Sequence, residues 1–286
     1  MIPLTRMAIF VAALAIVFAG AALAGAALDP RGDDRATDNE RAGHGAGAEE
    51  EAMTGHSAPD PVRGLAVADD GLRLVVDDPE LRRGETEEIH FRIADARGET
   101  VRDFDVEHEK RMHLIVARHD LTGFQHLHPE QAADGSWSIA ARLPEAGSYR
   151  MFADFTHDGT AQTLAADLRV DGRADLRPLP APAPEAVSDG GYDVQLDAAN
   201  ARPGAEAQLD FTITKDGEPI ETEPYLGAGG HLVALREGDL AFLHVHPAGD
   251  GVAFAATFPT AGRYRLFLQF QHEGRIHTVA FTREVA

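Results

Sequence analysis

The chain has 286 residues, with 47 acidic side chains, 26 basic ones and no cysteine, which gives a formal net charge of -21. This acidic balance argues against nucleic acid and anionic lipid as partners, because both attract a basic surface. The lack of cysteine excludes disulfides, thiolate metal ligands, cysteine nucleophiles and a lipoprotein-type anchor. Any metal ion would be held by histidine nitrogen, carboxylate oxygen or methionine sulfur.

The N-terminal residues read as a targeting element. Residues 7–28 are an unbroken run of apolar and small residues between Arg6 and Asp29. About 20 apolar residues can span a bilayer, while 22–24 (Ala-Leu-Ala) fits a cleavage site. We therefore predict that 1–28 is a signal peptide or a single transmembrane anchor, with the rest of the chain periplasmic or extracellular. Residues 29–61, rich in Gly, Ala and acids, are predicted to be a disordered acidic linker.

Short alternating segments begin at residue 62 and are separated by turn signals such as Asp70-Gly71 and Asp158-Gly159. This pattern, without a long amphipathic helix, is typical of antiparallel β-sandwiches. We predict an all-β protein of two tandem immunoglobulin-like sandwiches, after an N-terminal hydrophobic helix and a disordered tether. The expected repeats are 62–173 and 190–286, joined by a Pro-rich linker at 174–189.

Two long gap-free matches carry the prediction of a duplication. Residues 111–129 match 229–247, and residues 143–159 match 258–274. The second match contains a Pro-x-x-Gly-x-Tyr pattern that ends at Tyr149 and at Tyr264, where a tyrosine hydroxyl pins a corner in immunoglobulin-like sandwiches. Arg118 and Arg236 also recur, and we interpret them as solvent-facing charges on strands.

Four histidines recur at matching places in each half. Strand parity puts each of them on an apolar face near a strand end, and neutral imidazole suits Cu(II), Zn(II) and Ni(II). We predict one copper or zinc ion per repeat, with no organic cofactor and no catalytic residue. The alternative is that these histidines are structural and hydrogen-bond to backbone carbonyls. The candidate ligands are His113, His126, His128 and His157 in the first repeat, and His231, His244, His246 and His272 in the second.

The phrases MHLIVARHDLTGFQHLHP and HLVALREGDLAFLHVHP, followed by AGSYRMFADF and AGRYRLFLQF, resemble those of bacterial exported proteins described as heavy-metal-binding or YtkA-like. The likeness covers roughly 62–286. It implies an immunoglobulin-like sandwich outside the cytoplasmic membrane with a link to copper or other heavy metals.

We therefore expect a membrane-anchored or secreted protein that sequesters or buffers Cu(II) or Zn(II). Its expected partners are the metal ion and another exported metal-handling protein, with membrane contact through the N-terminal helix. Two other functions remain open. One is a protein-interaction module with structural histidines. The other is a copper redox enzyme of the superoxide dismutase type, although the cysteines and zinc loop of that family are missing.

Overall fold

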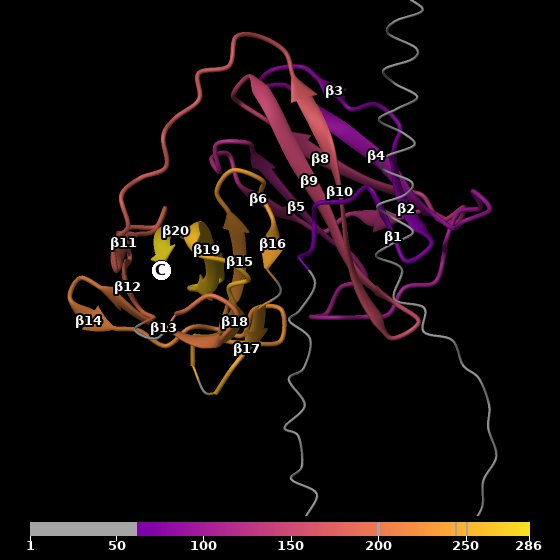
Figure 1. The fold of residues 1–286 in the computed structure, drawn as a ribbon. Coiled ribbons are helices and arrows are strands. Elements are labelled where there is room, and N and C mark those ends of the chain that lie inside the picture. The colour runs from indigo at the N-terminus through magenta and orange to yellow at the C-terminus, as the bar shows by residue number, and fades with distance from the viewer. Residues whose placement is uncertain (1–61, 199–200, 244, 250) are drawn as a thin grey trace, which may run out of the picture. The chain divides into compact units, whose positions relative to one another are not determined.

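The computed structural model describes residues 62–198, 201–243, 245–249 and 251–286, and every regular element in these ranges is a β-strand (Figure 1). The all-β prediction is confirmed there. No helix in the described ranges is long and apolar enough to cross a bilayer. The predicted hydrophobic helix, 1–28, and the predicted acidic linker, 29–61, lie outside the described residues.

The first half, drawn from indigo to salmon in Figure 1, forms two facing five-stranded sheets. One has the order β1-β2-β4-β8-β7 and the other β3-β10-β9-β5-β6. The strands are β1 (Ala68–Asp69), β2 (Leu72–Val76), β3 (Glu80–Leu81), β4 (Thr86–Ala94), β5 (His113–Arg118), β6 (Gln125–Leu127), β7 (Glu130–Gln131), β8 (Trp137–Arg142), β9 (Gly147–His157) and β10 (Thr160–Val170).

The second half, drawn in orange and yellow, repeats this plan with the sheets β11-β12-β13-β18-β17 and β16-β15-β19-β20, while β14 pairs with β13. Its first strand, β11, lies inside the stretch that the sequence predicted as a linker. The strands are β11 (Glu185–Val187), β12 (Asp193–Asp197), β13 (Glu206–Lys215), β14 (Glu218–Pro219), β15 (His231–Arg236), β16 (Phe242–Leu243), β17 (Val245–Pro247), β18 (Ala253–Thr257), β19 (Gly262–His272) and β20 (Arg275–Val285).

Each half encloses its own hydrophobic core between its two sheets. In β4 the buried side chains of Ile89, Phe91 and Ile93 alternate with more exposed ones, as expected for a strand with one face in the core. The second half has an equivalent core, to which β13 contributes Leu209 and Phe211. The strand order of both halves, with a tyrosine corner in each, is that of immunoglobulin-like sandwiches.

The two tyrosines predicted to pin a corner do so. The Tyr149 hydroxyl donates to the carbonyl of Glu145 at 2.9 Å, and the Tyr264 hydroxyl donates to the carbonyl of Thr260 at 2.8 Å. Each tyrosine is completely buried near the start of its long strand. The hydroxyl therefore ties the turn before the strand to the core that the ring fills.

A third hydrophobic cluster lies between the halves. In β5 every residue is buried, with Leu114 in the first core and Ile115 in this third cluster. In β15 the same split separates Leu232 from Val233. Strands buried on both faces lose the polar alternation and read as continuous apolar runs. The cluster also includes Leu179, which precedes β11.

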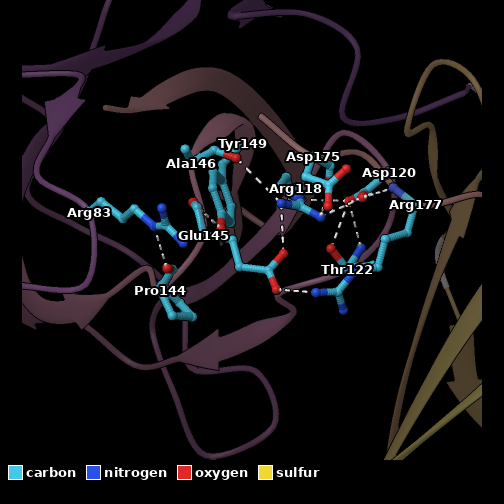
Figure 2. Close-up of polar contacts among 10 residues, drawn as sticks. All are labelled: Arg83, Arg118, Asp120, Thr122, Pro144, Glu145, Ala146, Tyr149, Asp175 and Arg177. Carbon is cyan, nitrogen blue, oxygen red and sulfur yellow. Dashed lines mark hydrogen bonds and ion pairs between the residues drawn. The ribbon is translucent and has the colours of Figure 1, made fainter. Parts of the chain in front are cut away.

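Arg118, at the end of β5, is buried with 1% exposure, so its interpretation as a solvent-facing charge is wrong. Figure 2 shows its guanidinium between the carboxylates of Asp120, at 2.6 Å, and Glu145, at 2.7 Å. It also donates to the carbonyl of Asp175, while the amide of Arg177 donates to Asp120. Burial acts to raise the pKa of Asp120, but these hydrogen bonds outweigh it and hold the pKa at about 2. The network fastens the segment after β10 to the first half.

Candidate metal centre

Three imidazoles of the first half converge at one end of β5 and β6. The possible ligand atoms of His113, His126 and His128 all lie within 4.8 Å of one another. His126 pairs across the strands with Ile115, so its ring lies on the face that carries Ile115 and His113. His128, two residues further on, follows His126 onto that side. This face is the one turned toward the third hydrophobic cluster.

The hydrogen bonds of two of these rings direct their lone pairs at each other. Nε2 of His113 lies 3.2 Å from the carbonyl oxygen of Glu107, which can only accept, so the ring proton sits on Nε2. Nδ1 of His126 lies 2.8 Å from Oε1 of Gln269 and donates to it. The other nitrogens, Nδ1 of His113 and Nε2 of His126, then face each other at 3.0 Å without a proton between them. Among the described residues, Nε2 of His128 is likewise buried with no hydrogen-bond partner.

The surroundings keep all three rings neutral near pH 7. Burial lowers the pKa of His113 to about 4 and the pKa of His128 to about 4. Burial, with electrostatic repulsion from the two neighbouring imidazoles, lowers the pKa of His126 to about 3. Three unprotonated nitrogens that share one small space are the arrangement that a divalent cation requires.

One metal-free arrangement can pair two of the three rings. If the amide of Gln269 turns over, its NH₂ group donates to Nδ1 of His126, and Nε2 of His126 then donates to Nδ1 of His113. This closes a chain of hydrogen bonds that ends at the carbonyl of Glu107. In this alternative Nε2 of His128 has no hydrogen-bond partner among the described residues, whereas a cation could accept all three lone pairs.

The second half adds a fourth imidazole, that of His231 at the start of β15. Its ring centroid lies 4.6 Å from that of His126, and it stacks on His113 at 5.6 Å with an interplanar angle of 7°. Burial, followed by repulsion from the neighbouring imidazoles, lowers the pKa of His231 well below its usual value. His108, which sequence reasoning did not select, lies 5.8 Å from His231, ring to ring. The cluster therefore contains side chains from both halves.

Three of the other predicted ligands lie in the described residues and do not join this cluster. His157 lies on the opposite face of β9, where Nδ1 bonds to the carbonyl of Asp103 at 2.9 Å. His272 bonds through Nδ1 to the Tyr192 hydroxyl at 2.9 Å. His246 is exposed on β17, which belongs to the other sheet of the second half. His244 lies outside the described residues. Among the described residues, the structure thus brings three of the predicted ligands together beside the junction of the halves, with His231 next to them.

Pairing register explains the position of His157. His113 pairs with Asp154 across β5 and β9, so Asp154 shares the face of the cluster. Residue 157 is three positions further along β9 and therefore points to the other side. Asp154 accepts from the Thr163 hydroxyl at 2.6 Å, and burial raises the pKa of its carboxyl group.

A cavity of about 300 Å³ adjoins the cluster. His113 and His231 line it together with His108, Asp154, Lys110 and the predicted ligand His246. It gives a small ion a route to the His113 and His231 side of the cluster.

The sequence matches the model of one family, described as a domain of unknown function (DUF8832), over residues 66–172 and again over 185–286. The chain belongs to this family. No curated protein matches the sequence. The family description names no activity, so the resemblance to heavy-metal-binding, YtkA-like proteins stays a prediction.

Among solved structures, the chain is similar to a Salmonella alpha-2-macroglobulin reacted with methylamine, at 13% identity and a TM-score of 0.28, covering 80% of this chain and 15% of that one. It is also similar to FdeC, an Escherichia coli adhesin, at 16% identity and a TM-score of 0.28, covering 77% of this chain and 66% of that one. A chimeric titin Z1Z2 matches at 14% identity and a TM-score of 0.20, over 74% of this chain and 96% of that one. Scores at this level carry no argument about function.

Proposed function

We propose that this protein binds one Cu(II) or Zn(II) ion per chain at the His113, His126 and His128 cluster and serves to sequester or buffer that metal. The observation that carries the proposal is the convergence of three neutral ring nitrogens, two of which face each other at 3.0 Å. Two lone pairs at that distance repel each other unless a proton or a cation lies between them.

The donor set favours these two metals. Three imidazoles and no thiolate suit Zn(II) and Cu(II), for which metal–nitrogen bonds are about 2.0–2.1 Å long. The outer nitrogens of His113 and His126 already donate to oxygen acceptors, as is usual for imidazoles that bind metal. His231 is the nearest further imidazole that could complete a tetrahedral site after a small ring movement.

The predicted location fits this role. An exported body on an N-terminal anchor, or one secreted after cleavage, would meet metal ions outside the cytoplasm. The formal charge of -21 would help to attract cations to the surface. The proposed partner for transfer of the metal is a second exported metal-handling protein.

Equilibrium dialysis of the purified chain against Cu(II) and Zn(II) tests the proposal. We expect one tightly bound ion per chain, lost in the double variant His113→Ala with His128→Ala. The double variant His157→Ala with His272→Ala is the matched control and should keep the ion, because these rings lie outside the cluster. Absence of bound metal at micromolar Cu(II) and Zn(II) would refute the proposed function.

A further inference from the structure

Gln269 of the second half supplies the hydrogen-bond acceptor for His126 of the first half. We propose that Gln269 is a positioning residue for the metal centre: it fixes the His126 tautomer, so the site is complete only when the two halves are docked. This inference rests on the proposed function and adds to it a dependence of metal affinity on the second half. None of the histidines selected from the sequence as ligands has this positioning role.

In the structure the Gln269 amide lies in the orientation that this role requires. Gln269 lies on β19 with 8% exposure and pairs across the strands with His231. Its Nε2 donates to the Thr278 hydroxyl at 3.3 Å, which leaves Oε1 to accept from Nδ1 of His126 at 2.8 Å. With its proton held on Nδ1, His126 presents a free lone pair on Nε2, the atom that faces His113.

Comparison of the halves shows that this position is suited to an acceptor. The gap-free match of 143–159 with 258–274 puts Asp154 at the place of Gln269. Asp154 pairs with His113 as Gln269 pairs with His231, and a threonine of the last strand contacts each of them. A carboxylate is thus compatible with this backbone position, which makes Gln269→Glu a realistic variant.

Apolar and polar contacts between the halves keep Gln269 beside His126. Phe124 stacks on Phe267 with ring centroids 4.1 Å apart, two residues before His126 on one side and two before Gln269 on the other. Arg150 donates to the carbonyl of Asp239 at 3.1 Å, also across the junction. Because Arg150 does not touch the imidazoles, its contact can be removed separately from that of Gln269.

The test is a competition titration of Zn(II) with a chromophoric chelator, on the full chain and three variants. Gln269→Leu removes the acceptor and should weaken Zn(II) binding by about 10- to 100-fold, the usual effect of losing such an outer hydrogen bond. Gln269→Glu restores an acceptor and should bind at least as tightly as the parent. Arg150→Met removes a different contact between the halves and should leave the affinity within about twofold of the parent value. Unfolding midpoints in excess chelator show whether each variant keeps its fold.

The outcomes separate the two proposals. If the parent binds no Zn(II) or Cu(II), the proposed function fails and this inference with it. If the parent binds and Gln269→Leu binds equally tightly, only the positioning role is overturned. Equal weakening in Arg150→Met, or failure of Gln269→Glu to recover the affinity, also overturns it, because the second half would then act through docking alone. Should Gln269→Leu fail to fold, the comparison of Gln269→Glu with the parent still decides, since weaker binding by the carboxylate variant contradicts the inference.

Discussion

Replacing His126 with Leu should make the metal-free protein less sensitive to acid. The pKa of His126 is about 3 in the folded chain, against 6.5 for an unperturbed histidine, because burial and the neighbouring imidazoles disfavour the charged ring. As the pH falls below 6.5 the unfolded chain therefore takes up this proton first, and folding stability is lost progressively until the pH reaches about 3. At about pH 5 this difference amounts to about 2 kcal/mol for the single imidazole.

The measurement is urea unfolding in excess EDTA at pH 8 and at pH 5. The fall in unfolding free energy between the two pH values should be about 2 kcal/mol smaller in His126→Leu than in the parent. Loss of the hydrogen bond to Gln269 should lower the unfolding free energy by a similar amount at both pH values. This loss therefore largely cancels when the two pH values are compared. His90→Leu, at an exposed position of β4, is the matched control and should keep the pH dependence of the parent. An equal fall in His126→Leu and the parent would mean that the ring is not held neutral by its surroundings.

Three further predictions concern stability. Asp120→Asn leaves a buried guanidinium poorly compensated and should lower the unfolding free energy by about 3 kcal/mol in urea titrations. Tyr149→Phe and Tyr264→Phe each remove one corner hydrogen bond and should each cost about 1 kcal/mol, measured in the same way. Zn(II) at about 100 times its dissociation constant should raise the unfolding free energy by about 2.7 kcal/mol, and EDTA or His113→Ala with His128→Ala should abolish that gain.

Much of the fold could be predicted from local patterns. The alternation in β4 indicates one buried face, and the matched Pro-x-x-Gly-x-Tyr turns indicate two tyrosine corners. The packing of the two halves against each other was indicated less directly by the sequence. Residues 113–118 and 231–236 are nearly continuous apolar runs, which is typical of strands covered on both faces. These runs indicate that each strand is buried on both faces. They do not show that the second face packs against the other half of the chain.

The members of the candidate metal centre could be predicted in part, but their grouping could not. His113, His126, His128 and His231 were selected because they recur between the halves. The faces on which they lie follow from the register of β5 against β6 and β9, which sequence spacing does not encode. The same register excludes His157.

Gln269 and Arg118 illustrate why the remaining features were missed. Gln269 has no counterpart of the same residue type in the first half, so a search for recurring residues passes over it. Arg118 recurs as Arg236, yet a charged residue at a strand end is usually solvated. Its burial depends on the carboxylates of Asp120 and Glu145, and Glu145 is distant in sequence.

The duplication itself argues for a single ion at this junction. The rings of His113 and His231 are stacked with centroids 5.6 Å apart, so two divalent ions bound one to each of these rings would lie close together. At about 6 Å and an effective dielectric constant of about 20, two such ions would repel by about 11 kcal/mol, which would weaken binding of the second ion. A bridging anion or a nearby carboxylate such as that of Asp154 would reduce this repulsion. The halves have diverged where this conflict would arise, with His108 matched by Leu226 and Asp154 by Gln269, and a one-sided centre avoids the repulsion.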